Sequence, residues 1–463
     1  MYNIFIMNIA NKYEYNELIK EFISQDEFRC FCENEETDSA EPLKDETEIT
    51  VINESGSSDK NQIKREIYHT LRKITGEAPA WGILTGVRPI KLAGEIYDRC
   101  NDLSKLREIL REEYLISREK IDLIVDTLTF QREKAGVPPK NSVGIYIGIP
   151  FCPTRCVYCS FASNQVGEPE IERYLEALKK EICFVGKGLA GSGLIPETIY
   201  IGGGTPTTLS SAQLNDLLST VRKSIDMSHL REFTVEAGRP DTITPEKLAV
   251  LREHKVDRIS INPQSMKEKT LELIGRSHKP EDIVKAFHMA KEVGFEHINA
   301  DLICGLPEEN ADDYKTTLDK TLALEPDNVT VHTLAVKRAS KLIEVDKDFH
   351  FKQADIVKEM LDITGDILKS KGFTPYYLYR QKHMAGALEN VGYCRGNTPC
   401  IYNIRIMEER QTIIAMGAGG ISKVYYPDEN RLERVANVTN YEIYISRIDE
   451  MLDRKENNIF KEV

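Results

Sequence analysis

The feature that most constrains the fold is a regular alternation of two kinds of segment that begins at Val143. Short runs rich in β-branched residues alternate with longer amphipathic runs, which is the pattern of parallel βα units. We predict six strands, at residues 144–149, 198–203, 232–237, 258–263, 297–303 and 328–334. Thr244, Pro245 and Glu246 read as the start of one intervening helix. Six such units can form an open α/β sheet or a partial barrel, and both place ligands at the carboxyl ends of the strands.

The rest of the chain has a different pattern, so we divide the sequence into three parts. Residues 1–140 are predicted to form an N-terminal α/β domain, in which an acidic loop from Glu33 to Glu48 precedes several helices. Residues 141–345 contain the βα series. Residues 346–463 read as a C-terminal extension with a long helix, an aromatic run and a glycine-rich segment, packed against the core.

Composition limits the classes of function. No run approaches the roughly 18 apolar residues of a membrane-spanning helix, and the start lacks a basic segment followed by a long apolar one. We therefore expect no transmembrane segment and a cytoplasmic location. The formal net charge of −13 argues against a general nucleic-acid surface. Ten cysteines in a long chain of this kind indicate reduced thiols or metal ligands.

Three cysteines follow the first predicted strand in the sequence GIYIGIPFCPTRCVYCSF: Cys152, Cys156 and Cys159. Thiolates bind iron–sulfur clusters, and a cubane cluster needs four ligands, so three local cysteines leave one iron open to a substrate. Cysteines that serve only packing, or a zinc site with three protein ligands, are the alternatives. Both fit less well, because core thiols are usually single and zinc sites usually contain C-x-x-C pairs or histidine.

A glycine run, IGGGTP at residues 201–206, follows the second predicted strand. Glycines let backbone amides and carbonyls approach a polar ligand closely, although such a loop is more often a tight turn. It does not match the dinucleotide pattern G-x-G-x-x-G. The position of the glycine run favours a ligand-binding role, since it and the cysteine loop would meet at the same end of the sheet.

At these residues the sequence resembles the radical S-adenosylmethionine (SAM) superfamily, and more closely its oxygen-independent coproporphyrinogen III dehydrogenase (oxidase) group. The motifs read IPFCPTRCVYC, GGGTP, SINPQSM and DLICGLP, and they cover residues 144–335 well. The segment WGILTGVRPIKL near the N-terminus resembles the HemZ-like branch. The resemblance implies a partial (βα)6 TIM-like barrel, with an N-terminal α/β domain and a C-terminal extension.

The resemblance also implies the cofactors: a 4Fe-4S cluster on the three cysteines, with SAM bound at the open iron. The residues that fall where the family contacts this SAM are Tyr146, Tyr158, Gly203, Glu236 and Ile421. The residues that fall where it contacts a second SAM or the substrate cavity are Gly204, Thr205, Gln264, Arg276, Asp301 and His332. Carboxylates can accept hydrogen bonds from ribose hydroxyls, and an arginine can pair with a carboxylate.

The implied reaction is oxidative decarboxylation of two coproporphyrinogen III propionates to vinyl groups, which gives protoporphyrinogen IX in heme biosynthesis. It requires an electron donor such as flavodoxin or ferredoxin, and an acceptor for the final electron. A heme chaperone of the same fold is one alternative, and a heme methyltransferase that opens the ring is another. Each of these functions has a tetrapyrrole as ligand.

Two positions depart from the pattern of the porphyrinogen dehydrogenases. Gly148 stands where they have histidine, and Phe161 stands where they have a further cysteine. Cationic residues that could meet the substrate carboxylates are Arg155, Lys337, Arg338, Arg380, Lys382 and Arg395. Cys394 and Cys400 make an incomplete auxiliary metal site at most, and packing is the more ordinary role for buried thiols.

Overall fold

The computed structural model describes residues 2–9, 11–24, 27–32, 48–53, 56–161, 163–335, 353–381 and 388–461. Contacts between Cα atoms divide the chain into two compact units. Among the described residues, the first unit runs to Thr129 and also takes in 379–381 and Leu388. The second unit runs from Phe130 to Leu378 and continues from Glu389. The three-part division at residues 140 and 345 remains a prediction.

The first unit contains a three-stranded parallel sheet in the order β2-β1-β3. Its strands are β1 (Tyr2–Ile6), β2 (Phe28–Cys32) and β3 (Glu48–Ile52). Its helices are α1 (Tyr13–Ile19), α2 (Lys60–Thr75), α3 (Pro89–Cys100), α4 (Leu103–Glu112) and most of α5 (Arg118–Lys134). The predicted acidic loop falls outside the described residues, except that Glu48 begins β3.

The second unit is built on an eleven-stranded sheet, and its centre confirms the predicted βα series. Six strands lie side by side in chain order and in parallel. They are β4 (Ser142–Ile149), β5 (Ile195–Gly203), β6 (Glu232–Glu236), β7 (Arg258–Ser260), β8 (His297–Cys304) and β9 (Asn328–Thr333). Because all six run in the same direction, their carboxyl ends form one edge, as the α/β class requires.

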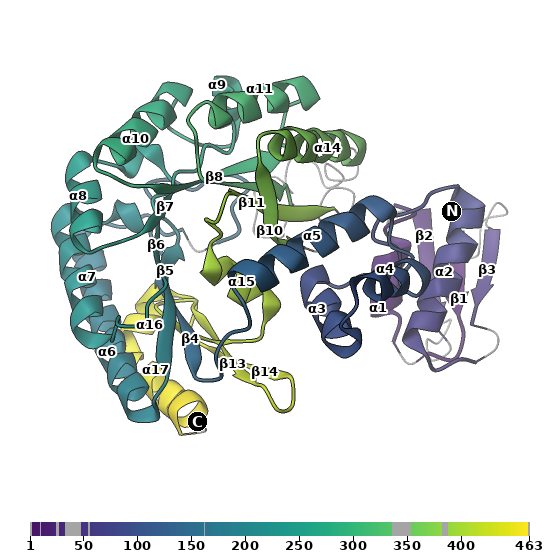
Figure 1. Cartoon of the computed structure of the whole chain (residues 1–463), viewed down its shortest axis with the longest axis horizontal. Helices are drawn as coiled ribbons and strands as arrows, with labels where there is room; N and C mark the ends of the chain where they lie inside the picture. Colours follow the sequence, from purple (N-terminus) through teal and green to yellow (C-terminus); the bar gives the residue numbers. More distant parts are fainter. Residues whose placement is uncertain are drawn as a thin grey trace. The chain divides into compact units, whose positions relative to one another are not determined.

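Helices cover the outer side of these strands, and Figure 1 shows them following an arc. They are α6 (Glu168–Ser192), α7 (Ser211–Ser224), α8 (Pro245–Glu253), α9 (Glu268–Leu273), α10 (Pro280–Glu292) and α11 (Ala311–Leu322). The predicted helix start at Thr244 is confirmed, because its side chain accepts a hydrogen bond from the Lys247 amide at 3.3 Å. Alternate strand residues such as Ile145 and Ile147 are fully buried in this core.

The C-terminal residues extend the sheet at both edges. At one edge β11 (Glu389–Arg395) pairs antiparallel with β9 and is followed by β10 (Phe373–Arg380). At the other edge β12 (Thr412–Met416) pairs in parallel with β4, and β13 (Ile421–Tyr426) and β14 (Arg431–Ala436) follow. The helices of this region are α14 (Ala354–Ser370), α15 (Ile401–Glu408), α16 (Tyr441–Ser446) and α17 (Ile448–Lys455).

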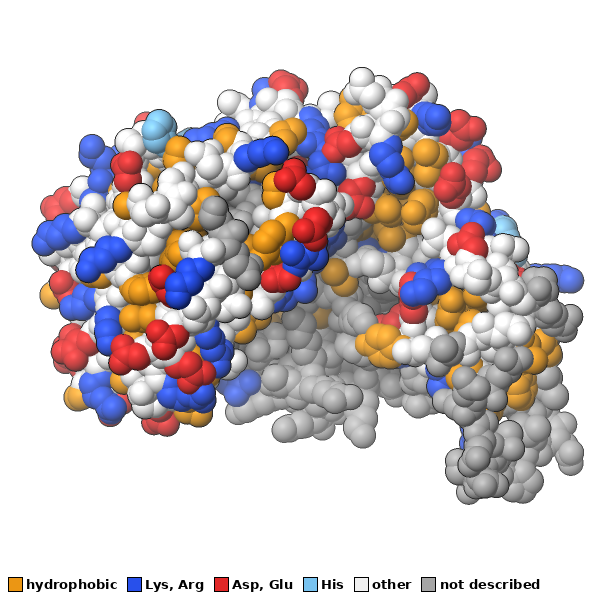
Figure 2. Space-filling view, turned by 90° about the horizontal axis from the view of Figure 1, so that it is seen from below, with side chains coloured by type: hydrophobic (Ala, Val, Ile, Leu, Met, Phe, Trp, Pro, Cys, Tyr) orange, Lys and Arg blue, Asp and Glu red, His pale blue; other side chains and the backbone are white. Residues whose placement is uncertain are grey.

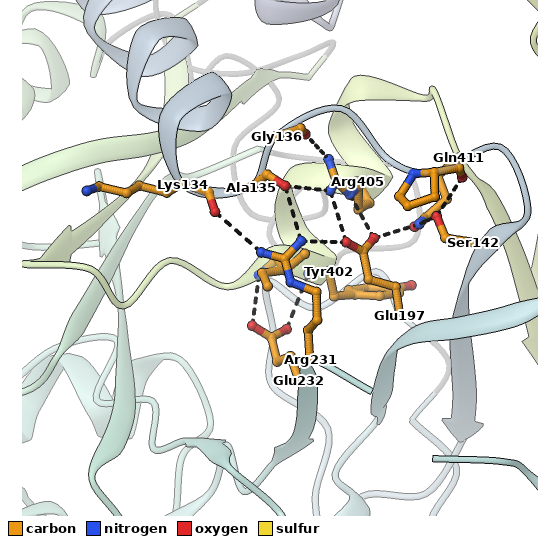
Figure 3. A network of polar contacts seen from close by, with 12 residues as sticks. Lys134, Ala135, Gly136, Ser142, Glu197, Arg231, Glu232, Tyr402, Arg405 and Gln411 are labelled. Atoms are coloured by element: carbon orange, nitrogen blue, oxygen red, sulfur yellow. Dashed lines mark hydrogen bonds and ion pairs between the residues drawn. The ribbon is translucent and has the colours of Figure 1, made fainter. Parts of the chain in front are cut away.

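A buried polar network lies at the start of β5 (Figure 3). The Arg405 guanidinium, only 1% exposed, donates from Nε and Nη2 to the two carboxylate oxygens of Glu197, at 2.9 and 3.0 Å. Arg231 and Gln411 donate to the same carboxylate at 2.7 Å each. Burial raises the pKa of Glu197, but these donors outweigh it, and the pKa lies below its usual value.

The surface is mixed in charge. On the face of the described residues shown in Figure 2, Lys and Arg side chains are interspersed with Asp and Glu rather than gathered in one patch. Among the described helices, none combines the length and the apolar character needed to cross a bilayer.

Candidate functional site

The cysteine loop begins directly at the carboxyl end of β4. Cys152 and Cys156 are buried and Cys159 is half-buried. The Cys152 amide donates to the Asn164 carbonyl at 3.1 Å, and the Cys159 amide donates to the Cys156 carbonyl at 3.1 Å. Backbone hydrogen bonds therefore hold this loop at both ends of the cysteine pattern.

The glycine run packs against the cysteine loop. Gly203 ends β5 with φ at +114°, a conformation that side chains disfavour. A Cβ atom on Gly204 would lie 2.5 Å from the Phe151 carbonyl oxygen and 3.0 Å from the Cys152 sulfur. Only glycine permits this approach, so the two motifs that the sequence analysis singled out do meet at one end of the sheet.

Arg276 contacts the cysteine loop through Tyr158. Its Nη2 donates to the Tyr158 hydroxyl at 3.2 Å, and its Nη1 donates to the carbonyls of Asn262 at 2.8 Å and Gly238 at 3.3 Å. The buried Nε has no hydrogen-bond partner within the described chain. Buried polar atoms are normally paired, so an unpaired guanidinium nitrogen here is consistent with a missing ligand.

Glu236 is the last residue of β6, and it contacts one of three stacked tyrosine rings. Tyr200 donates a hydrogen bond to Glu236 Oε1 at 2.7 Å. The Tyr200 ring stacks on Tyr402, with ring centroids 4.6 Å apart, and is nearly parallel to Tyr146 at 6.3 Å. Burial raises the pKa of Glu236 to about 7, against the hydrogen bond from Tyr200, which lowers it. The sequence analysis named Tyr146 and Glu236 but not Tyr200, although register pairing places Tyr200 beside Tyr146.

Asp301 and His332 lie on β8 and β9, and Gln264 lies in the segment after β7, where it forms an isolated bridge with Leu302. The Gln264 amide donates to the Asp301 carbonyl at 2.9 Å with the unusual φ of +64°, and the buried Gln264 Oε1 has no partner within the described chain. Asp301 accepts from Asn299 at 2.7 Å and lies 3.6 Å from His332 Nε2. These three predicted residues are therefore neighbours at the carboxyl edge.

The remaining predicted SAM contact, Ile421, and one of the two positions that depart from the dehydrogenase pattern, Phe161, are exposed, whereas Gly148 is buried. Ile421 begins β13 and is 48% exposed. Phe161 is 67% exposed at the end of the cysteine loop. Gly148 accepts a hydrogen bond from the Tyr174 hydroxyl at 2.6 Å on its carbonyl oxygen.

Arg239 is a residue that sequence reasoning missed. Its Nη1 donates to both the hydroxyl of Thr154, at 2.7 Å, and the carbonyl of Thr154, at 3.2 Å. Its Nε and Nη2 donate to the two carboxylate oxygens of Asp241, at 3.0 and 2.8 Å. Thr154 lies between Cys152 and Cys156, so this buried arginine fastens the cysteine loop to the segment after β6. No motif in the sequence indicated this contact.

The proposed substrate cations have different environments. Arg380 is buried against Glu21 at 2.8 Å, within the first unit. Arg155 is exposed in the cysteine loop. The prediction for Arg395 is wrong, because its amide donates to the Asp327 carbonyl just before β9, at the amino end of the parallel strands and away from the cysteine loop. The predictions for Lys337, Arg338 and Lys382 lie outside the described residues.

Cys394 and Cys400 are buried within the sheet region. The Cys400 thiol donates to Glu232 Oε1 at 3.1 Å, and the same carboxylate accepts from the Ile401 amide at 2.8 Å. Glu232 thus caps the first turn of α15, where a negative charge is favourable. The Cys400 thiol therefore takes part in a structural hydrogen bond at the start of α15.

The cysteine loop fits an iron–sulfur cluster. Within the described chain, no group of three or more His, Cys, Asp or Glu side chains is arranged to hold one metal ion. Cluster thiolates each bind a different iron and do not converge on one ion. Three thiols in one loop, the close approach of Gly204 and the unpaired Arg276 Nε match a cluster with a polar ligand beside it.

Comparison with known proteins defines the class to which this fold and cysteine loop belong. The model of the Radical SAM superfamily matches residues 146–321. The HemN coproporphyrinogen III oxidase of Escherichia coli, whose structure is described as that of a radical SAM enzyme, is similar with a TM-score of 0.54. That similarity covers 70% of this chain and 73% of HemN at 22% sequence identity, so it supports the fold.

Sequence relatives narrow the class. The oxygen-independent coproporphyrinogen-III oxidase-like protein HemZ of Bacillus subtilis is 41% identical over 406 residues, which is 86% of this chain and 80% of HemZ. The heme chaperone HemW of the same organism is 34% identical over 235 residues, covering 50% of this chain and 61% of HemW. The chain belongs to the radical SAM superfamily and, within it, to the coproporphyrinogen oxidase-like group that includes HemZ. Membership implies a 4Fe-4S cluster and SAM.

Proposed function

We propose that the chain is an oxygen-independent enzyme that oxidatively decarboxylates coproporphyrinogen III to protoporphyrinogen IX. The observation that carries the proposal is the close packing of the cysteine loop on the glycine run in a chain 41% identical to HemZ. In this proposal Cys152, Cys156 and Cys159 hold three irons of the cluster. SAM would bind beside the cluster.

When bound, the cluster and SAM would supply radical chemistry that removes a hydrogen atom from the substrate. The protein residues bind and orient the ligands. Glu236 and Asp301 offer carboxylate oxygens to ribose hydroxyls, and Arg276 offers a guanidinium to a carboxylate. The residues proposed to contact the cluster-bound SAM are Tyr146, Tyr158, Gly203, Glu236 and Ile421. The proposed contacts of a second SAM or of the substrate cavity are Gly204, Thr205, Gln264, Arg276, Asp301 and His332.

The proposed reaction also requires cations that bind the substrate, an electron donor and an electron acceptor. A tetracarboxylate tetrapyrrole requires cations, and Arg155, exposed in the cysteine loop, is a candidate at the carboxyl end of the strands. Reduction of the cluster requires a low-potential donor such as flavodoxin or ferredoxin. Release of carbon dioxide leaves one electron that must pass to a further acceptor.

A heme chaperone is the second candidate. The similarity to HemW favours it, and so do Gly148 and Phe161, which stand where the dehydrogenases have histidine and cysteine. A chaperone of this kind would bind heme and transfer it without consuming a porphyrinogen.

One experiment separates these functions. The cluster is reconstituted anaerobically, and reductant, SAM and coproporphyrinogen III are added. Mass spectrometry then follows the tetrapyrroles and 5'-deoxyadenosine together. Stepwise loss of two carboxyl groups with formation of 5'-deoxyadenosine supports the dehydrogenase. Formation of 5'-deoxyadenosine with unchanged porphyrinogen contradicts it, and heme binding and transfer are then measured.

A further inference from the structure

The glycine run is held against the cysteine loop by its backbone. The Gly204 amide donates to the Ile149 carbonyl at 2.8 Å, and the Thr205 amide donates to the Phe151 carbonyl at 2.8 Å. Phe151 directly precedes Cys152. The position of the Thr205 side chain relative to this cysteine is therefore set by main-chain hydrogen bonds on both segments.

The hydroxyl of Thr205 points to the sulfur of Cys152. Its Oγ1 lies 3.4 Å from Cys152 Sγ, which is within hydrogen-bond distance for sulfur. Thr205 is only 3% exposed, so water does not compete freely for the contact. In a free thiol either atom could donate. A thiolate bound to iron has no proton, so the hydroxyl must then be the donor.

We propose that Thr205 is a positioning residue that donates a hydrogen bond to the Cys152 sulfur and thereby raises the reduction potential of the cluster. Hydrogen bonds to the sulfurs are among the factors that set cluster potentials. A donor stabilises the reduced cluster more than the oxidised one, because the reduced cluster carries the greater negative charge. The inference rests on the proposed function, which makes Cys152 a cluster ligand.

This role differs from the one that the family resemblance implies for Thr205. A hydroxyl that contacts a second SAM or the substrate would affect the KM of that ligand and leave the cluster potential unchanged. The hydroxyl contact seen in the structure is to sulfur. The two roles therefore predict effects on different measured quantities.

The test compares Thr205→Val, which keeps the shape and removes the hydroxyl, with Thr205→Ser, which keeps the hydroxyl. Both full-length variants and the unaltered protein are reconstituted anaerobically and titrated with dithionite while the reduced cluster is followed by electron paramagnetic resonance. We expect a more negative midpoint potential for Thr205→Val at full iron content. Thr205→Ser should keep a potential close to that of the unaltered protein.

Equal potentials in Thr205→Val and the unaltered protein would overturn the inference, and so would an equal shift in Thr205→Ser. Failure of the unaltered protein to bind a cluster would instead overturn the proposed function. If Thr205→Val loses iron, resonance Raman spectra of the unaltered protein and Thr205→Ser in H2O and D2O replace the titration. Fe–S(Cys) bands that shift on exchange in both proteins support the hydrogen bond, and bands that do not shift contradict it.

Discussion

The two ends of the parallel strands in the second unit are both buried and polar, yet their carboxylates, Glu197 and Glu236, differ in how they are paired. At the start of β5, Glu197 accepts hydrogen bonds from Arg405, Arg231 and Gln411, and its pKa is below the usual value. At the carboxyl end, burial raises the pKa of Glu236 to about 7. Both ends also contain buried polar atoms without a partner in the described chain, such as Gln411 Oε1 at the start and Gln264 Oε1 at the carboxyl end.

The difference between the two carboxylates indicates which end is held by internal ion pairs and which end can offer a carboxylate to a ligand. A buried carboxylate is retained where several donors compensate for its lost hydration. In parallel βα folds, ligands bind at the carboxyl ends of the strands while the amino ends contribute stability. Four predictions test this comparison, from the largest effect to the smallest.

The largest effect is expected at the cysteine loop. Cys156→Ala removes one of three proposed iron ligands, so cluster binding and SAM cleavage should be abolished. Iron content and 5'-deoxyadenosine formation measure both. The control is Cys183→Ala, since Cys183 is exposed on α6. A Cys156→Ala protein prepared anaerobically with normal iron content would disprove the cluster assignment.

Substitution at the start of the strands should affect stability more than chemistry. Arg405→Met leaves the buried Glu197 carboxylate and the carbonyls of Ala135 and Gly136 without this guanidinium. Removing one partner of a buried ion pair costs about 3–5 kcal/mol. Unfolding in guanidinium chloride should show the lower free energy of unfolding. Protein that remains folded should still bind iron when the cluster is reconstituted. Arg434→Met, on an exposed side chain, is the control. An unchanged unfolding midpoint would contradict a structural role for the network.

The pH dependence of SAM binding tests the carboxyl end. Because Glu236 has a pKa of about 7, its carboxylate form becomes dominant above that pH, and SAM affinity should rise as pH increases through about 7. Tyr200→Phe removes a hydrogen bond that lowers this pKa, so the rise should move to higher pH. A hydrogen bond to a charged group contributes about 1.5–3 kcal/mol, so affinity at pH 7 should fall roughly tenfold or more.

Equilibrium dialysis with cluster-loaded protein measures this affinity. The matched control is Tyr402→Phe, because the Tyr402 ring stacks on Tyr200. A Tyr200→Phe profile identical to that of the unaltered protein would show that Tyr200 does not act through Glu236.

The smallest effect is expected at Cys400. Cys400→Ser retains a donor for Glu232, so iron content should equal that of the unaltered protein and stability should change by less than about 1 kcal/mol. Metal analysis and thermal unfolding measure these quantities. Lower iron content in the variant would support the hypothesis of an auxiliary metal site at Cys394 and Cys400.

Local sequence patterns were enough to predict the central strands and the meeting of the two motif loops. Short β-branched runs and helix caps are local signals, and the parallel βα pattern places successive loops at one edge. Arg239, Tyr200 and Arg405 carried no such signal. Each acts through a partner distant in the chain: Thr154, Glu236 and Glu197 respectively.

The sequence by itself determined the βα order, the cofactor class indicated by its motifs and the residues to which the family's contacts correspond. Only the tertiary structure decided where the C-terminal residues lie, with β11 pairing with β9 and β12 with β4. It also decided the pairing of Lys455 with Glu181, at 2.6 Å, where both side chains are fully buried. The physical reason is that burial and ion pairing depend on which distant segments the folded sheet brings together, whereas capping and strand alternation depend on near neighbours.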